Sequence, residues 1–312
     1  MRSGIWPPDC ITRTQMHRRV LHSAVFLLAA AALHAQNPES HGLSFGASFL
    51  GSANSLGTVT KVDASAGYFF KRHWQIDFGV PFYSVFPSAS ATAAGNTKVT
   101  GIGNVYTQIR FTKVHPKLNY VSTLTATAPT GDRAKGLSTG HATVDWGNYF
   151  DRSFRRLTPF VEVGIANSVS DTTFFVRPYT SSGLITRGQA GARFRIASVV
   201  ALGASGYVIE PVGDQTVISR VVTHGNSAPQ VPGNVPGSGA VNRLLKRPVF
   251  EETTVTTGSA SIARDRGFSG FLLLGRNPGI NTYVGYTRST QFDLNTVFFG
   301  IGYNLRKPLG GL

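Results

Sequence analysis

Apolar and polar residues alternate along most of twelve separate stretches that we interpret as strands, with the facing of 199–209 left open. In the stretch 118–128, Leu118, Tyr120 and Leu124 share one side of an extended backbone, and Thr123 and Thr125 share the other. Alternation over about ten residues, bounded by turn residues, is typical of the strands of a transmembrane β-barrel, although soluble β-sandwiches alternate too. The twelve predicted strands span 43–51, 58–70, 74–86, 101–111, 118–128, 142–151, 157–167, 183–196, 199–209, 267–275, 280–289 and 295–305.

The connections between these predicted strands differ in a regular way. Those that follow odd-numbered strands are long or polar, including 52–57, and those that follow even-numbered strands are tight turns, such as 71–73. Outer-membrane barrels have long loops at one end, tight turns at the other and an even number of strands. Closure also leaves no unpaired strand edge in lipid. We therefore expect an all-β fold, a transmembrane antiparallel β-barrel of about 12 strands connected as an up-and-down meander.

The N-terminal region has the features of a secretory signal peptide. A basic start at Met16 precedes the apolar run 24–33 and a small-residue cleavage site that ends at Ala35. Residues 1–15 do not fit this pattern, so we expect translation to start at Met16. The expected location is the bacterial outer membrane. The expected organisation is a signal peptide at 1–35, a short periplasmic segment at 36–42, the barrel at 43–305 with a long flexible extracellular loop at 211–266, and a tail at 306–312.

Composition supports a β-rich membrane protein. Charged residues make up 14% of the chain, against about 25% in soluble domains, and the chain has 35 Gly, 21 Phe and 10 Tyr. The formal net charge is +15. No helix–turn–helix, zinc-finger or RNP-type pattern accompanies this charge, so we favour an anionic membrane surface over nucleic acid as its partner. The one cysteine, Cys10, precedes the signal peptide's apolar run. No residue spacing indicates a metal site, and no cofactor is expected.

One predicted hairpin loop resembles a known family. The segment TATAPTGDRAKGLSTG contains Pro129, Thr130, Gly131 and Asp132, and it is similar to the Pro-Thr-Gly-Asp loop of outer-membrane transporters associated with phenol degradation by the meta-cleavage pathway. The segments WQIDFGVPFYSV and GIGNVYTQIRF resemble strands of the same family, with Asn104 in place of an acid. The resemblance implies a barrel over most of 43–305 that takes up small hydrophobic or aromatic compounds.

The last predicted strand resembles the C-terminal motif by which such barrels are assembled. Gly300, Tyr303 and Leu305 have the spacing of that motif, while Phe298 replaces its usual polar residue. The resemblance implies that the barrel-assembly machinery is a partner of this strand.

If the apolar faces meet lipid, the polar faces line the lumen. The charged residues on those faces are balanced in sign, which predicts no strong preference for cations or anions. They could line an open pore or fill a closed lumen with ion pairs, because twelve strands lie between the filled eight-stranded barrels and the open sixteen-stranded ones. The lumen candidates are Lys61, Asp63, Asp77, Arg110, Asp145, Glu162, Arg193 and Arg195.

The surplus of basic residues falls mainly in the predicted tight turns and the tail. A basic rim could hold anionic phospholipid headgroups, or these residues could be ordinary solvated turns. Asp151 is the single acid predicted there. The predicted rim residues are Lys71, Arg72, Lys113, Lys117, Arg152, Arg155, Arg156, Arg276, Arg306 and Lys307.

Three functions remain open from the sequence. The first is passive or facilitated passage of a small solute across the outer membrane. The second is a structural or adhesive barrel that exposes loop 211–266. The third is a barrel enzyme acting on lipid, which we disfavour because Phe271 replaces the second glycine of a nucleophile elbow around Ser269, and no triad can be assembled. No catalytic residue is predicted.

Overall fold

The structure is a computed structural model that describes residues 41–70, 73–88, 98–170, 179–217, 221–223, 248–250, 256–258, 263–275 and 280–308. The predicted signal peptide and most of the predicted loop 211–266 lie outside these ranges. Among the described residues, no helix is long and apolar enough to cross a membrane.

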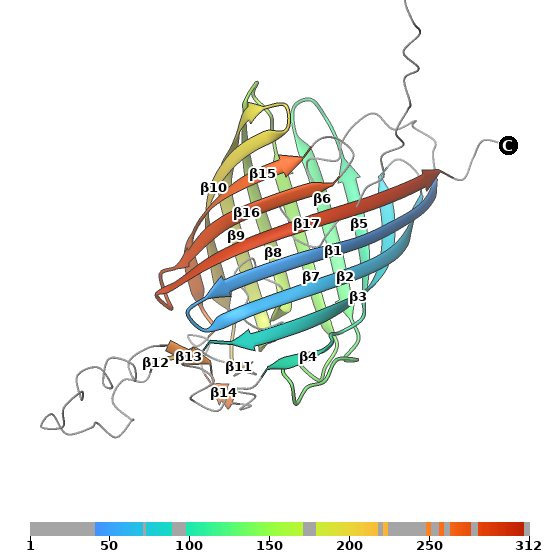
Figure 1. The fold of residues 1–312 in the computed structure, drawn as a ribbon. Helices are drawn as coiled ribbons and strands as arrows, with labels where there is room; N and C mark the ends of the chain where they lie inside the picture. Colours follow the sequence, from blue (N-terminus) through green and yellow to red (C-terminus); the bar gives the residue numbers. More distant parts are fainter. Residues whose placement is uncertain are drawn as a thin grey trace, which may run out of the picture.

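Twelve antiparallel strands close into a single barrel (Figure 1). Each strand pairs with the next barrel strand in the chain, and the last strand pairs with the first from Gly42↔Pro308 to Asn54↔Thr296. The predicted 12-stranded meander is therefore confirmed. The wall consists of β1 (Gly42–Asn54), β2 (Gly57–Phe70), β3 (Trp74–Pro87), β5 (Tyr106–Lys113), β6 (Asn119–Thr127), β7 (Thr143–Asp151), β8 (Leu157–Ser170), β9 (Tyr179–Ala197), β10 (Val200–Pro211), β15 (Asp265–Gly275), β16 (Asn281–Ser289) and β17 (Leu294–Pro308).

The two ends of the barrel differ in their connections. We call the end that holds the turns 114–118 and 198–199 the tight-turn end, and His41 and Pro308 lie at this end too. The opposite end, drawn at the bottom of Figure 1, is the loop end. Its connections carry the short strands β4 (Val99–Ile102), β11 (Gln215–Val217), β12 (Val221–Thr223), β13 (Pro248–Phe250) and β14 (Thr256–Gly258).

Several element boundaries differ from those predicted, and three of these differences change the interpretation of the chain. The run 101–111 is not one strand, because β4 pairs with the end of β3 and β5 pairs with its start, leaving 103–105 between them. The predicted loop 52–57 is a two-residue turn, since both strands continue and the side-chain oxygen of Asn54 accepts a hydrogen bond from the Leu56 amide at 2.8 Å. Strand β17 continues to Pro308, so the predicted tail begins later.

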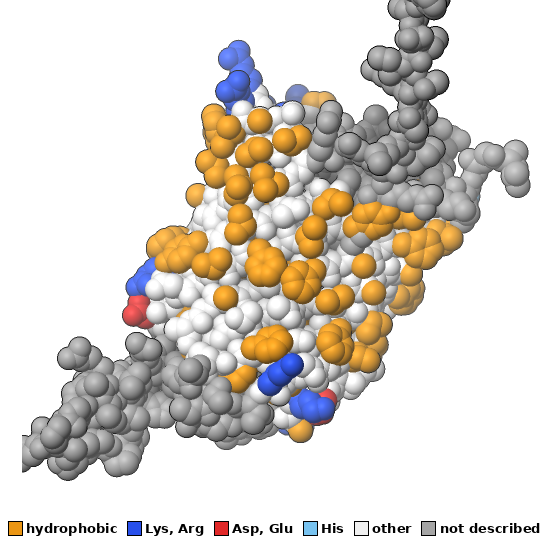
Figure 2. Space-filling view, viewed as in Figure 1, with side chains coloured by type: hydrophobic (Ala, Val, Ile, Leu, Met, Phe, Trp, Pro, Cys, Tyr) orange, Lys and Arg blue, Asp and Glu red, His pale blue; other side chains and the backbone are white. Residues whose placement is uncertain are grey.

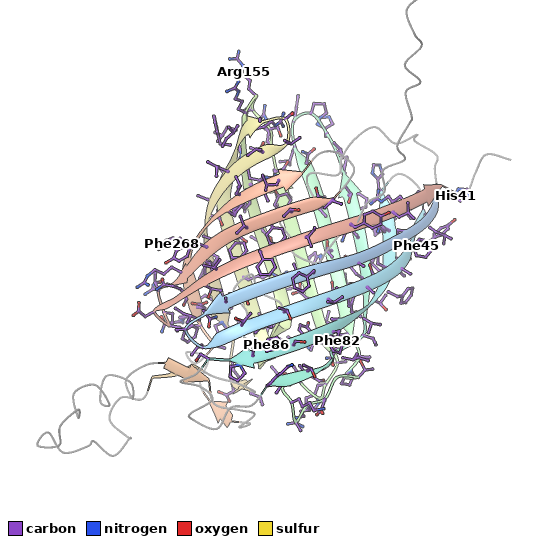
Figure 3. All side chains as sticks on the ribbon, in the orientation of Figure 1. His41, Phe45, Phe82, Phe86, Arg155 and Phe268 are labelled. Carbon is purple, nitrogen blue, oxygen red and sulfur yellow. The ribbon has the colours of Figure 1, made fainter. Side chains whose placement is uncertain are left out.

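The outer wall of the barrel is apolar and exposed. Phe78 is 57% exposed and Val297 is 52% exposed, and large hydrophobic side chains spread over the wall between the two ends (Figure 2). Phe45, Phe82, Phe86 and Phe268 point away from the barrel in Figure 3. Alternation sends every second side chain outward. An apolar band of this extent is unfavourable in water and favourable in lipid, so the wall has the surface of a membrane-spanning barrel.

The packed core of this fold lies inside the barrel. Inward-facing rings fill it, and some cover inward-facing glycines on neighbouring strands. A Cβ atom on Gly300 would lie 2.3 Å from the ring of Tyr283, and one on Gly285 would lie 2.3 Å from the ring of Phe298. Glycine at these positions therefore lets the rings lie flat against the wall. The main interior cluster is Leu50, Val121, Tyr149, Phe160, Phe271, Tyr283 and Phe298, each at most 5% exposed.

Candidate functional site

The lumen of the barrel is the candidate functional site, because charged side chains from most of the strands converge there. Near its middle, Lys61 Nζ lies 3.4 Å from Asp63 Oδ2 on the same strand, β2. The hydroxyl of Tyr106 donates to Asp63 Oδ1 at 2.7 Å, and Lys61 Nζ lies 5.6 Å from the ring centroid of Tyr83. A buried charge is tolerated only when it is paired, so these contacts stabilise both charges.

A second ion-pair group joins β7, β8 and β9. Arg187 makes a two-pronged ion pair with Asp145, in which Nη2 donates to Oδ1 at 2.7 Å and Nη1 contacts Oδ2. Its Nε also lies 3.5 Å from Glu162 Oε1. One guanidinium therefore lies between two carboxylates, so acidic groups outnumber basic groups in this ion-pair group.

A third group lies toward the tight-turn end. Arg193 Nη2 donates to Asp151 Oδ2 at 2.6 Å and to the Tyr149 hydroxyl at 2.8 Å. Asn119 donates to the other carboxylate oxygen of Asp151 at 2.7 Å. The guanidinium carbon of Arg193 also lies 5.7 Å from the ring centroid of Phe160. Asp151 is thus an inward-facing partner of Arg193, and its prediction as a rim residue is wrong.

A fourth group lies at the same end, on β3, β5 and β17. Arg306 Nη2 donates to Gln75 Oε1 at 2.6 Å, and Arg110 Nη2 donates to Gln108 Oε1 at 2.6 Å. Asp77 accepts hydrogen bonds from Gln75 at 2.8 Å and from Ser44 at 2.9 Å. Arg306 was predicted at the rim from its place in the tail, but β17 is long enough to carry its side chain into the lumen.

The structure brings most of the predicted lumen residues together. Lys61, Asp63, Asp77, Glu162 and Arg193 are buried in the lumen, and Arg110 and Asp145 are half-buried there. Arg195, two residues beyond Arg193, is exposed at the tight-turn end. A contact between any of these residues and a solute stays a prediction.

Besides Asp151, three lumen residues were missed from the sequence. Arg187 has the same parity on its strand as Arg193, so the alternation alone would have placed it in the lumen. Asp265 fell inside the predicted loop 211–266, and no local signal marked it; it accepts a hydrogen bond from the Ser289 hydroxyl at 2.5 Å. Arg306 could not be placed without knowing where β17 ends.

The loop 128–142, which carries the Pro129–Asp132 motif, docks into the gap between β4 and β5. The Thr130 hydroxyl accepts a hydrogen bond from the Val105 amide at 2.9 Å and lies 3.2 Å from the Gly103 carbonyl oxygen, to which it donates. The Gly131 amide donates to Asn104 Oδ1 at 3.1 Å. The motif therefore holds the loop against the inner edge of β3–β5.

The rest of this loop reaches into the lumen. The side chain of Leu137 is fully buried, and it packs with Val59, Tyr83, Val85 and Val99. Asp132 and Lys135 form an exposed ion pair of 3.1 Å, and the hydrogen bond from Lys135 holds the pKa of the Asp132 carboxyl below its usual value. Loop 128–142 thus covers part of the lumen at the loop end.

Solved structures that are similar to this barrel include outer-membrane channels and porins. An outer-membrane channel from Pseudomonas putida F1 is similar over 89% of this chain and 98% of its own, with a TM-score of 0.52 and 10% sequence identity. The NanC porin is similar over 83% of this chain and 99% of its own, with a TM-score of 0.43 and 8% identity. A KdgM porin in complex with disordered oligogalacturonate covers 83% of this chain and 98% of its own, with a TM-score of 0.42 and 7% identity.

No protein-family model matches this chain, and no curated protein sequence matches it. At 10% identity, the similarity to the P. putida channel establishes the fold. By that fold and by its apolar outer wall, the protein is an outer-membrane type β-barrel.

Proposed function

We propose that this protein is a channel of the bacterial outer membrane through which a small solute passes, by diffusion or by weak, facilitated binding. The division of side chains between the two faces of the wall carries the proposal. Hydrophobic residues such as Phe78 and Val297 are exposed on the outside, while charged residues such as Lys61 and Glu162 are buried inside. Such a wall separates lipid from a polar route along the barrel axis.

The solute that we propose is small and hydrophobic or aromatic. The resemblance of the Pro129–Asp132 loop to the transporters associated with phenol degradation supports this class. The rings of Tyr83, Tyr149 and Tyr283 support it as well, because they place aromatic groups inside the barrel, where a movement of the interior packing would expose them to a solute. The route to the membrane that we propose is a signal peptide at 1–35 followed by assembly through β17.

The packed lumen favours a second candidate function. Inward side chains such as Lys61, Tyr83 and Leu137 are at most 1% exposed, so this part of the lumen is tightly packed. A barrel that is permanently filled would serve a structural or adhesive role. We favour a channel because loop 128–142 is a connection and not part of the barrel wall, so it can move while the wall stays paired.

Single-channel recording of the refolded protein in a planar bilayer tests the proposal. We expect discrete openings from a closed baseline, with weak preference between cations and anions because the lumen charges are nearly balanced. A liposome-swelling series of neutral aromatic solutes would then identify the preferred class. A folded barrel that never conducts, even after loop 128–142 has been loosened, contradicts the proposal and favours the structural role. Analysis of lipid products in the same vesicles tests the enzyme alternative.

A further inference from the structure

We propose that a groove on the outer wall of the barrel binds one anionic phospholipid, with an acyl chain along the groove and the phosphate at Arg266. The groove has a volume of about 580 Å³ and crosses β8, β9, β10 and β15. We call it the outer groove. The inference goes beyond the proposed function, because a lipid on the outer wall does not pass through the lumen. The lining includes Val161, Val163, Gly188, Ala190, Gly206 and Phe268.

The register of the four strands places the outer groove on the lipid-facing side of the wall. Val161 pairs with Ala190, which pairs with Gly206 on its other side. Gly206 pairs in turn with Phe268, so these four residues form one row across the wall. Val161 is 46% exposed and Phe268 is 51% exposed, and Phe268 points away from the barrel in Figure 3. The row therefore has two small residues between two large, exposed side chains.

The floor of the outer groove extends along β9 and β10. On the same face of β9, the next residue toward the loop end is Gly188, and the next one toward the tight-turn end is Ala192, which pairs with Ala204. One row farther, Phe194 pairs with Leu202, and these side chains are 47% and 48% exposed. Small residues thus continue over three rows before large side chains bound the floor.

The packing of the barrel does not require glycine in this floor. A Cβ atom on Gly206 would lie 3.8 Å from its nearest neighbour, and one on Gly188 would lie 3.5 Å from its nearest neighbour, both ordinary contacts. On the inward-facing Gly203 of the same strand, a Cβ atom would lie 2.2 Å from the ring of Phe271. Glycine weakens a strand interior, and it is typical of places where a ligand approaches the backbone closely. The outer groove leaves room for such an approach.

One hydrocarbon chain matches the width and the chemistry of the outer groove. Neighbouring strands lie about 4.8 Å apart, so a floor of two strands is about 10 Å wide before the flanking side chains narrow it. The large side chains along its edges, such as Val163 and Phe268, are apolar. An empty groove in a membrane forfeits the dispersion contacts of its lining, and an acyl chain restores them.

Arg266 supplies the positive charge at the loop end of the outer groove. It is the second residue of β15, and it pairs with Val208 in the row that also contains Gly188. Its side chain is exposed, while those of its neighbours Asp265 and Gly267 are turned to the other face. Its carbonyl oxygen accepts hydrogen bonds from the amide of Thr290 at 2.8 Å and from the hydroxyl of Thr290 at 3.0 Å. The backbone that carries Arg266 is therefore fixed to the end of β16.

The charge of Arg266 is available for an anion. Two other arginines at this end are paired with acids: Arg264 Nε lies 2.7 Å from Glu210 Oε2, and Arg288 contacts Asp293. Arg266 forms no ion pair with any residue that the structure describes. Its planar guanidinium matches two phosphate oxygens, so a phosphate at the mouth of the groove would complement this charge. The acyl chain of the same lipid would then lie on the apolar floor.

Native mass spectrometry of the refolded protein in an uncharged detergent tests the role of Arg266. Phosphatidylglycerol and phosphatidylcholine with the same acyl chains are titrated in parallel, because they differ in net charge. We expect the first phosphatidylglycerol to bind about fivefold more tightly than phosphatidylcholine, the effect of one arginine near an anionic lipid. Arg266→Gln should remove this preference. Arg195→Gln is the matched control, since it removes an exposed arginine at the opposite end of the barrel and should leave the preference unchanged.

Gly206→Leu tests the groove in the same assay. The wall has room for this side chain, which would fill the floor, so we expect the affinity for both lipids to fall about tenfold, as when about two methylene groups lose their contacts. Ala190→Leu fills the same row and serves if Gly206→Leu does not fold. Ala47→Leu is the control, because it adds a leucine to the exposed face of β1, outside the groove.

Several results would overturn the inference. These are equal affinities of the parent protein for the two lipids, a preference for phosphatidylglycerol that survives Arg266→Gln, and unchanged lipid affinity in the groove-filling variants. A dimeric parent protein that becomes monomeric on Gly206→Leu would also overturn it, because a second copy would then occupy the groove. Gel mobility without boiling shows whether each variant is folded. The assay does not measure conduction, so its outcome is separate from that of the conductance test.

Discussion

Arg187 forms ion pairs with two inward-facing carboxylates, more than any other arginine whose ion pairs the structure describes. Its guanidinium contacts Asp145 through two nitrogens and Glu162 through the third. The exposed fractions of the two acidic side chains are 24% and 6%. Removal of the shared cation leaves two carboxylates facing each other in a region of low dielectric, which is the costly way to break a buried ion pair.

We therefore predict that Arg187→Gln destabilises the barrel by about 3–5 kcal/mol, as is typical when one partner of a buried pair is removed. Denaturant unfolding in lipid vesicles, followed by tryptophan fluorescence and by gel mobility without boiling, measures the change. The control is Arg288→Gln, which breaks an ion pair with Asp293, a side chain that is 82% exposed. Surface pairs contribute about 0–1 kcal/mol, so equal effects of the two substitutions would contradict the prediction.

At the scale of elements, loop 128–142 covers part of the lumen at the loop end. The loop occupies the gap between β4 and β5, and Leu137 anchors its inner part among four apolar side chains of the lumen wall. The loop is not paired with a strand of the wall, so we expect that it can move while the barrel wall stays intact.

Leu137→Asp should release this loop, because a carboxylate cannot remain in a fully buried apolar cluster without a partner. We expect longer or more frequent openings in planar bilayers and an unchanged mobility of the folded barrel on gels. Lys135→Ala is the control, since Lys135 lies in the same loop, its side chain is 53% exposed, and it contacts only Asp132 among the described partners. If Leu137→Asp conducts like the parent protein, loop 128–142 does not obstruct the route.

The strands of this protein could be predicted from its sequence because period-two alternation depends only on neighbouring residues. All twelve barrel strands appear near their predicted positions, and Leu124 and Phe78 face outward as expected. The break at 103–105 could not be predicted, since it is filled by Thr130 and Gly131 from another hairpin. For the same reason the sequence placed Arg306 on the rim: its position depends on the pairing of β17 with β1, which joins the two ends of the chain.

At the scale of the whole molecule, the outer wall is a surface that only lipid stabilises. The part of the wall at the bilayer midplane and the part near the interface can be distinguished by the free-energy cost of placing a charged side chain there. A lipid-facing arginine costs about 2–4 kcal/mol at the bilayer midplane and about 0–1 kcal/mol near the interface.

We predict that Val80→Arg, near the middle of β3, lowers the stability of the inserted barrel by about 2–4 kcal/mol. Leu118→Arg, next to the tight turn before β6, should cost less than about 1 kcal/mol. The two parent side chains are similarly exposed, at 43% and 47%, so depth is the main difference between them. Refolding titrations in vesicles measure both variants. A result in which Leu118→Arg is the more harmful substitution would contradict this placement of the membrane.

The pairing of β1 with β17 also determines when this barrel can be completed. Asn54 donates to Thr296 at 3.4 Å across that pairing, and the two residues are 242 positions apart in the chain. During synthesis, one edge of β1 stays unpaired until the final strand, β17, has been made. A chain that stops before β17 has two open edges, on β1 and on β16, and lipid cannot satisfy the backbone groups of either edge. A stable barrel in the membrane therefore requires the complete set of twelve strands, and a chain that lacks β17 is not expected to insert stably.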